Sequence, residues 1–321
     1  MPKRVMFWVG AIRAPFFVVV IIPSILGTVI AWANTGKVNW AFFILATIGA
    51  MGVNSGTNLI NDYFDHKSKN DEINKEFLAP FTGGSRFIQN GLLTPATVFV
   101  AAMLSFLVVA IIGIYFVFAT GWPVLVIGLI GVFCGYFYSA PPFRLGHKPV
   151  GEAIVGINCG ILVTLGAYWV QTQTLAWQPV IAAIPSAILV AAILWINEFP
   201  DYAADQAVGK IQLMGRLGKP KAAKVYSVIM LVTYVPIVFG VIAGVSSGAV
   251  PALAQVQLPV LALLSLLTLP LALRATRVAM AHYQNTAELA PANVLTIKIM
   301  ISSGLLLAAG FFFTGLIQNV F

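Results

Sequence analysis

The sequence predicts an all-α fold: a polytopic membrane protein in which nine transmembrane helices form a bundle. Its 321 residues are 60% apolar and only 9% charged, and their mean hydropathy is +0.93. A soluble domain needs far less apolar surface than this for its core. The apolar residues also gather into stretches of about 20 residues, the length of helix that crosses the hydrocarbon core of a bilayer.

The predicted helices follow one another along the whole chain. The first follows Arg13 and lacks a cleavage pattern of small residues, so we interpret it as a span and not as a signal peptide. Several contain Pro or Gly, which membrane bundles tolerate because neighbouring groups satisfy the freed backbone atoms. Cys134 and Cys159 lie within spans without redox or metal-ligand spacing. In chain order the spans are expected at about residues 15–33, 40–61, 95–119, 122–138, 151–170, 178–198, 222–244, 250–273 and 294–317.

The basic residues are distributed so unevenly between alternate loops that they predict an orientation. With the N-terminus inside, every Lys and Arg except Lys37 falls on the inner side, as do all ten acidic residues. Cytoplasmic loops are enriched in Lys and Arg. We therefore expect a multi-pass protein of the cell's inner (plasma) membrane, with its N-terminus and functional loops in the cytoplasm. The net charge of +8 suits anionic lipid headgroups and an anionic substrate, and no nucleic-acid motif accompanies it.

Most of the acidic residues lie in two short clusters, each where an apolar span meets a polar loop. The first contains Asn58, Asp62 and Asp65 and continues with Asp71, Glu72 and Glu76; the second contains Asn197, Glu198, Asp201 and Asp205. A spacing of four residues stacks side chains on one face of a helix. Carboxylates at the ends of membrane spans are costly and by default functional. Two such faces predict a site for Mg²⁺ and a diphosphate, because Mg²⁺ prefers oxygen ligands shared with phosphates.

The two clusters also indicate an internal repeat. By our count four spans separate their equivalent positions, so both clusters face the same side of the membrane. We expect a single domain, residues 1–321, built from two parallel four-helix repeats and one further helix. The repeats would cover about residues 10–145 and 146–275, and the last helix about 292–318.

Basic side chains on the same inner side are candidates for binding phosphate oxygens. They are Arg86, Arg144, Lys148, Lys210 and Arg216. A long polar loop follows each acidic motif, at residues 66–94 and 206–221. Loops of this length in a compact protein are usually functional, so we interpret both as lids over the site.

Together these motifs resemble those of the UbiA-type intramembrane aromatic prenyltransferases. The resemblance covers nearly the whole chain and rests on the two acidic motifs, on Tyr138-Ser-Ala-Pro-Pro-Phe-Arg144, and on Gly209-Lys210 with Arg216-Leu-Gly218. It implies an all-helical bundle that transfers a polyprenyl group from its diphosphate. It also implies Mg²⁺ bound by Asn58, Asp62 and Asp65 on one face and by Asn197, Asp201 and Asp205 on the other, with these four aspartates and Tyr138 catalytic.

One position departs from that family pattern. Many members have a third carboxylate where this chain has Lys69, and Asp71 is the nearest substitute. The sequence leaves open whether Asp71 reaches the metal. By the same resemblance, Tyr138 would place aromatic π density near the reacting prenyl carbon, where it stabilises an allylic cation.

Within the family, the sequence around Asn61-Asp62-Tyr63-x-Asp65, Gly83-Gly84-Ser85-Arg86 and Asn197-Glu198-Phe199-Pro200-Asp201 is most similar to the branch that prenylates 1,4-dihydroxy-2-naphthoate in menaquinone synthesis. The alternative acceptor is 4-hydroxybenzoate or another ring used in the family. A less favoured alternative is a secondary transporter of an anionic solute, which would place its charges near the bilayer midplane. Prenyl chain length and oligomeric state are left open by the sequence.

Overall fold

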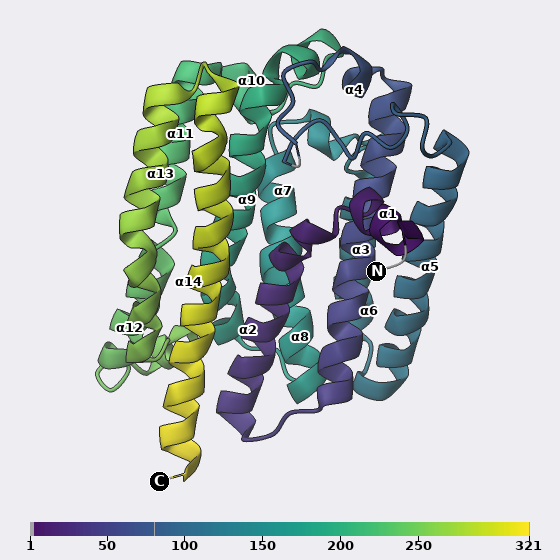
Figure 1. The fold of residues 1–321 in the computed structure, drawn as a ribbon. Coiled ribbons are helices and arrows are strands. Elements are labelled where there is room, and N and C mark those ends of the chain that lie inside the picture. The colour runs from purple at the N-terminus through teal and green to yellow at the C-terminus, as the bar shows by residue number, and fades with distance from the viewer. Residues whose placement is uncertain (1–2, 80, 321) are drawn as a thin grey trace.

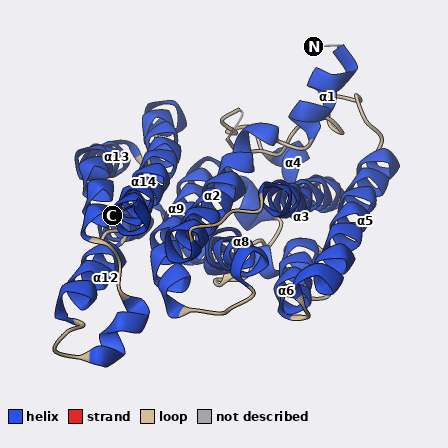
Figure 2. Cartoon of the chain, turned by 90° about the horizontal axis from the view of Figure 1, so that it is seen from below, coloured by secondary structure: helices blue, strands red, loops and turns tan. Residues whose placement is uncertain are grey.

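The computed structural model describes residues 3–79 and 81–320, and these residues form helices and loops without a strand (Figures 1 and 2). The α-helices are α1 (Lys3–Ala11), α2 (Val18–Thr35), α3 (Trp40–Lys67), α4 (Asn70–Ile73), α5 (Pro95–Thr120), α6 (Pro123–Phe137), α7 (Gly151–Gly156), α8 (Val163–Thr172), α9 (Trp177–Ala207), α10 (Leu213–Leu217), α11 (Lys219–Val232), α12 (Val235–Ser246), α13 (Leu269–His282) and α14 (Thr286–Val320). Short 3₁₀ helices are η1 (Ala14–Phe17), η2 (Leu145–His147), η4 (Pro251–Val256) and η5 (Val260–Thr268), and η3 (Ile157–Leu162) is a π-helix.

Eight helical segments of the described chain are long and apolar enough to cross a bilayer. They are Ala14–Thr35, Trp40–Lys67, Pro95–Thr120, Gly151–Thr172, Trp177–Ala207, Lys219–Ser246, Val260–His282 and Thr286–Gln318. The prediction of an all-α, polytopic membrane protein is therefore confirmed. The remaining expected span corresponds to α6, which is apolar but has only 15 residues. The count of nine spans stays a prediction.

The span predicted at 250–273 is misplaced, because the structure has a helical segment at Val260–His282 instead. Residues Pro251–Val256 form the separate short helix η4. The predicted span ends before Arg274 and Arg277, whereas the helix continues through both. Long arginine side chains can lie along a helix and reach the polar interface, so they need not end a span.

Helix α9 lies in the middle of the bundle, where it packs against α2, α7, η3, α11, α12 and α14 (Figure 1). Small residues on its surface, such as Ala183 and Ala187, are buried. Small residues let neighbouring helix backbones approach closely in membranes, where lipid removes the usual hydrophobic drive between helices. At Gly27 of α2 the approach to α8 is so close that an added Cβ would overlap the carbonyl oxygen of Thr164.

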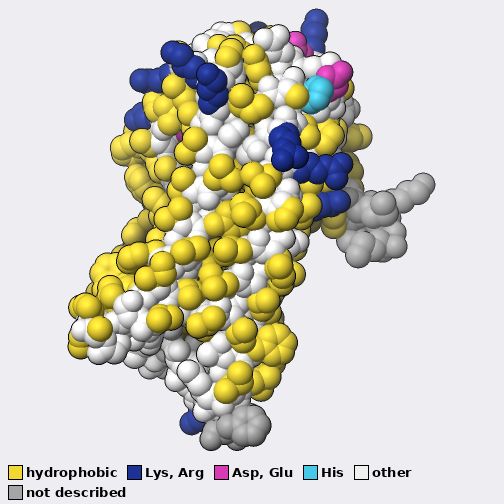
Figure 3. Space-filling view, turned by 90° about the vertical axis from the view of Figure 1, so that its left-hand side faces the viewer, with side chains coloured by type: hydrophobic (Ala, Val, Ile, Leu, Met, Phe, Trp, Pro, Cys, Tyr) yellow, Lys and Arg dark blue, Asp and Glu magenta, His cyan; other side chains and the backbone are white. Residues whose placement is uncertain are grey.

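The face seen in Figure 3 is apolar along most of its length, and most of its charged side chains gather toward one end. On α5, Leu107, Ile111 and Phe118 are exposed. Such a surface is suited to hydrocarbon and not to water. The short helices α4 and α10 lie at one end of the bundle and the C-terminus at the other (Figure 1). The end with α4 and α10, where α3 and α9 also finish, carries both acidic motifs.

Candidate active site

The two acidic motifs lie on two continuous helices. Helix α3 extends to Lys67 and α9 to Ala207, each several residues beyond the predicted end of its span. The i, i+4 positions therefore remain helical throughout both motifs, even past Pro200. Their ends converge on Lys210. Its Nζ lies 3.8 Å from Asp65 Oδ2 and 3.4 Å from Asp205 Oδ1, so one buried ammonium group bridges a carboxylate from each motif.

Asp62 is held by two residues that the sequence analysis does not assign to the site. Arg13 forms an ion pair with its Oδ1, and the Ser85 hydroxyl donates to its Oδ2. The Ser85 backbone N–H also points at this carboxylate, 3.3 Å from each oxygen. The sequence predicts Arg13 only as a topology charge, because nothing in it indicates that the segment before α2 turns toward α3. In the structure Arg13 adopts φ 54°, between α1 and η1.

The loop after α3 folds back across both motifs. Asn70 Nδ2 donates to Asp205 Oδ1 at 2.8 Å, and Asn74 Nδ2 donates to Asp201 Oδ1 at 2.6 Å. Both asparagines are buried. Their spacing of four matches the spacing of the aspartates they contact, a signal that a search for carboxylates overlooks. The described residues of the loop between α3 and α5, which the sequence predicts at 66–94, therefore cover the site.

Asp71 lies within the same cluster. It is buried, and Gln89 Nε2 donates to its Oδ2 at 3.3 Å. A Cβ at Gly84 would lie 2.6 Å from Asp71 Oδ2 and 3.2 Å from Asp62 Oδ1, so both carboxylates flank this glycine. Burial, together with the charges of Asp65 and Asp62, raises the pKa of Asp71 to about 8. The chain reaches this arrangement because α3 ends and Lys69 takes a left-handed conformation, with φ 62°.

The two motif asparagines point away from the carboxylates. Asn197 Oδ1 accepts a hydrogen bond from Asn293 Nδ2 of α14 at 2.7 Å. Asn58 Nδ2 donates to the carbonyl oxygen of Ile12 at 3.2 Å. In contrast, Asn61 Nδ2 donates to Asp65 Oδ2 at 2.9 Å, inside the cluster. The predicted roles of Asn58 and Asn197 as metal ligands stay predictions.

Of the five basic residues predicted to bind diphosphate, Lys210 lies in the cluster. Arg86 instead donates to the backbone carbonyls of Asp71 and Asn74, and its guanidinium lies 3.9 Å from the centre of the Phe77 ring. These contacts hold the loop in shape. The other three side chains, Arg144, Lys148 and Arg216, are exposed on the segments that follow α6 and α9. Their contact with a diphosphate stays a prediction.

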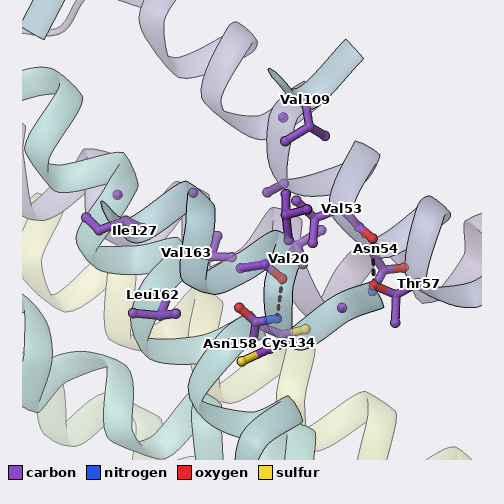
Figure 4. A pocket seen from close by; sticks show the side chains of 18 of the residues that line it. Val20, Val53, Asn54, Thr57, Val109, Ile127, Cys134, Asn158, Leu162 and Val163 are labelled. Atoms are coloured by element: carbon purple, nitrogen blue, oxygen red, sulfur yellow. Dashed lines mark hydrogen bonds between the residues drawn. The ribbon is translucent and has the colours of Figure 1, made fainter. Parts of the chain in front are cut away.

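Below the carboxylates is a cavity of about 450 Å³. Arg13, Asn58, Asn61 and Tyr138 line it near the site, and most of its remaining wall is made by aliphatic residues of α3, α5, α6 and α8 (Figure 4). Tyr138 is buried, and its ring packs so closely on Gly146 that a Cβ there would lie 2.6 Å away. The cavity can therefore hold an apolar molecule whose polar end lies at the carboxylates.

The carboxylate cluster has the chemistry of a hard divalent cation site. Asp62, Asp65, Asp71 and Asp205 are buried and Asp201 is partly buried, whereas Arg13 and Lys210 are the two cations among the described residues in contact with them. Even with Asp71 protonated, four carboxylates face these two cations. Buried carboxylates are normally paired or bound to metal, so this excess of negative charge favours further cations. Among the described residues no three Asp, Glu, His or Cys side chains are close enough to enclose a metal ion. Lys210 bridges the two faces, and Asn70 and Asn74 of the loop after α3 donate to the carboxylates of the α9 face.

Comparison with known proteins identifies the chain. The sequence profile of the UbiA prenyltransferase family matches residues 20–297. The chain belongs to the UbiA prenyltransferase family. This confirms the resemblance inferred from the motifs and makes the protein a prenyltransferase. As a family member with many apolar helices, it is a multi-pass membrane protein.

Two curated relatives are naphthoquinone-pathway enzymes by name. The chain is 26% identical over 317 residues to 2-carboxy-1,4-naphthoquinone phytyltransferase of Synechocystis, covering 98% of this chain and 96% of the relative. It is 29% identical over 226 residues to 1,4-dihydroxy-2-naphthoate octaprenyltransferase of Bacillus subtilis, covering 70% of each.

Solved structures share the fold. A UbiA homologue from Archaeoglobus fulgidus bound to GPP and Mg²⁺ superposes with a TM-score of 0.61 at 14% identity, covering 94% of this chain and 99% of that one. The apo UbiA homologue from Aeropyrum pernix gives 0.66 at 14% identity, with coverage of 96% and 98%. The A. fulgidus homologue thus binds a divalent metal together with a prenyl diphosphate.

Proposed function

We propose that this UbiA-family protein transfers a polyprenyl group from its diphosphate to 1,4-dihydroxy-2-naphthoate, with loss of CO₂, in menaquinone biosynthesis. The observation that carries the proposal is the convergence of two carboxylate faces above an apolar cavity of about 450 Å³. A prenyl diphosphate has the matching polarity: an anionic head and a long hydrocarbon chain. The names of the curated relatives support the choice of acceptor.

The metal would be Mg²⁺, held by Asp62, Asp65 and Asp71 on one face and by Asp201 and Asp205 on the other. When bound there, it would neutralise the charge that develops on the departing diphosphate. The A. fulgidus homologue with GPP and Mg²⁺ supports this choice. We also propose that Asn58 and Asn197 rotate toward the carboxylates when the metal binds.

Lys210 and Arg13 would contact the diphosphate oxygens. Burial acts to lower the pKa of Lys210, but Asp205 and Asp65 outweigh it and hold that pKa well above its usual range. Lys210 therefore stays protonated and can donate to phosphate oxygens in a site from which water is excluded. Arg144, Lys148 and Arg216 would add charge at the mouth of the site and attract the anionic substrate.

The bond changes are balanced without an oxidant or reductant. The C1–O bond of the prenyl diphosphate breaks and its electron pair leaves with the diphosphate. The ring carbon that carries the carboxylate then bonds to the allylic C1. The bond between that ring carbon and the carboxylate breaks, CO₂ leaves, and the electron pair restores the aromatic ring. Tyr138 would face the allylic cation, and the cover formed by residues 66–94 would exclude the water that quenches it.

We propose further that the protein lies in the plasma membrane with its site facing the cytoplasm. The support is the charge distribution: with the exception of Lys37, all Lys and Arg residues fall on the side of the site in the topology inferred from the sequence. The prenyl diphosphate and the acceptor would then enter from the cytoplasmic side of the bilayer.

Product mass spectrometry tests the proposal. Purified protein receives Mg²⁺ and geranylgeranyl diphosphate, with 1,4-dihydroxy-2-naphthoate and 4-hydroxybenzoate in competition. We expect a prenylated naphthoquinol that has lost CO₂. A prenylated hydroxybenzoate that keeps its carboxylate would show that 4-hydroxybenzoate is the acceptor instead. If neither product forms, whether or not EDTA is present, the proposal is contradicted and transport of an anionic solute is favoured.

A further inference from the structure

Two amide side chains interrupt the apolar wall of the cavity below the carboxylates. Asn54 of α3 and Asn158 of η3 both line it, as Figure 4 shows, on different helices. Polar residues within membrane spans are rare and by default functional. Neither amide touches the carboxylate cluster, and the proposed reaction gives neither of them a role.

Both amides lie at a similar depth below the site. Asn54 precedes Asp62 by eight residues, which is about 12 Å along a helix. Asn158 Nδ2 donates to the carbonyl oxygen of Gly131 at 3.2 Å. Gly131 in turn precedes Tyr138 by seven residues, or about 10 Å. The amides therefore lie roughly two turns from the place where the diphosphate would bind.

Part of each amide remains free to bind a ligand. Asn158 Oδ1 has no hydrogen-bond donor among the described residues, while its Nδ2 is held by Gly131. Asn54 Oδ1 accepts from Asn58 Nδ2 at 3.1 Å. Its amide nitrogen makes no hydrogen bond to another side chain or backbone carbonyl among the described residues. The pair thus offers an oxygen acceptor and N–H donors to the cavity.

The backbone around Asn158 is unusual. Residues Ile157–Leu162 form a π-helix, a rare conformation that is frequent at functional sites and changes which side chains face a given direction. Gly156 and Gly160 fix it against α9, since a Cβ at Gly160 would lie 2.6 Å from the Cα of Ala187. The π-helix is therefore firmly positioned, and Asn158 with it.

A hydrocarbon chain cannot satisfy these amides. Polar groups buried against hydrocarbon without a hydrogen bond are costly. A ring with an oxygen substituent removes that cost, because its hydroxyl can donate to Asn158 Oδ1 and accept from an N–H of Asn54. The aromatic acceptor carries such oxygens and the prenyl chain does not.

We propose that Asn54 and Asn158 bind the acceptor hydroxyl that is farther from the reacting ring carbon, and so position the ring beneath Tyr138. This inference rests on the proposed function. For 1,4-dihydroxy-2-naphthoate the hydroxyl in question is the one at ring position 4. The two asparagines are positioning residues: they select the acceptor and fix its orientation, and they do not touch the diphosphate.

The test compares N158L with the unmodified protein in lipid nanodiscs. Three constants are measured: the KM values of the dihydroxynaphthoate acceptor and of geranylgeranyl diphosphate, and the competitive inhibition constant of 1-hydroxy-2-naphthoate, which lacks the 4-hydroxyl. In N158L we expect the acceptor KM to rise about tenfold, the effect of one lost hydrogen bond. We expect the other two constants to stay unchanged, since neither the analogue nor the prenyl diphosphate uses the amide.

The matched control is S105A. Ser105 lies on α5 outside the lining of the cavity, and its hydroxyl donates to the carbonyl oxygen of Ala101 at 2.9 Å within its own helix. This variant should leave all three constants unchanged. If N158L does not fold, N158A replaces it, because alanine adds no bulk at the π-helix.

Three outcomes would overturn the proposal. One is an unchanged acceptor KM in N158L. Another is an equal rise for the acceptor and for the analogue, which would indicate general distortion of the cavity. The third is a rise in the KM of geranylgeranyl diphosphate alone, which would place the amides along the prenyl chain. If the unmodified protein prenylates no aromatic acceptor, the proposed function itself is wrong. That result is distinct from the three above, because it is obtained without any variant.

Discussion

The two acidic motifs have similar spacing and lie at the same end of the bundle, yet their surroundings differ. The motif of α3 is followed by a long loop that folds back and reaches the other motif through Asn70 and Asn74. The motif of α9 is followed by a shorter loop, which supplies Lys210. The first region therefore supplies the cover of the site, and the second supplies the cation between the two faces.

The two regions also differ in how they are fixed. Helix α9 lies at the centre of the bundle, whereas α3 packs mainly against α5 and α2 nearer its edge. The carboxylate of Glu198, next to the α9 motif, is buried without a hydrogen-bond partner in the described part of the chain. The comparison shows that similar spacing does not imply equal roles. The relation of residues 10–145 and 146–275 as two repeats stays a proposal.

The largest expected effect comes from removing one carboxylate from each motif. D62N and D201N should each lower kcat by about 10³-fold, because each removes a carboxylate that would hold the Mg²⁺ needed to neutralise the departing diphosphate. EDTA should abolish the activity of the unmodified protein, and excess Mg²⁺ should restore it. Product formation is measured by mass spectrometry, and folding by size-exclusion chromatography. Near-normal turnover in both variants would remove the metal-site assignment.

The next largest effect is expected from weakening the contact between the loop after α3 and the motif of α9. N74A removes the hydrogen bond of 2.6 Å to Asp201 Oδ1 without touching a carboxylate. We expect kcat/KM for the prenyl diphosphate to fall about tenfold, the typical effect of losing a hydrogen bond to a charged group. Cleavage within residues 66–94 by added protease should become faster. Unchanged protease sensitivity would show that this bond does not hold the lid.

Substitution of Lys210 tests whether this cation, which lies between the two motifs, also binds the prenyl diphosphate. K210M should raise the KM of the prenyl diphosphate by about tenfold, because a buried ammonium that donates to phosphate is lost. K224M is the matched control, since Lys224 is exposed on α11 and makes no ion pair in the described structure. Equal effects of both substitutions on that KM would mean that only net charge matters.

The smallest effect concerns His147, on the short helix η2. Burial and the positive charge of Lys210 lower the pKa of His147 to about 4, from an ordinary value of 6.5. The unfolded chain therefore binds a proton more readily than the folded one between these values, so stability falls as pH drops from about 6.5 toward 4. H147Q should reduce this loss, giving a slightly flatter curve of melting temperature against pH. An identical curve for both proteins would contradict the shift.

Much of the site can be predicted from the sequence because its signals are local. A helical spacing that ends apolar spans identifies Asp62, Asp65, Asp201 and Asp205, and α3 and α9 do carry them on continuous helices. The position of Lys210 soon after the second motif identifies that residue too. Asp71 is, by sequence, only a possible substitute for the carboxylate missing at Lys69, and the end of α3 decides that it lies beside Asp62.

The partners of these carboxylates could not be predicted. Arg13 lies 49 residues from Asp62, and Asn70 lies 135 residues from Asp205. No periodicity links such distant positions, since the contact depends on how the chain turns between helices. The left-handed residues Arg13 and Lys69 make two of these turns, and neither residue type predicts such a conformation.

The sequence by itself determined that this is an all-helical membrane protein with a carboxylate site at one end, because composition, span length and i, i+4 spacing are properties of short segments. Tertiary structure alone decided which side chains complete the site. It brought Asn70 and Asn74 over the second motif, directed Asn197 toward α14, and turned Asn158 into the cavity. The physical reason is that hydrogen-bond partners between helices are fixed by packing, and packing is a property of the whole bundle.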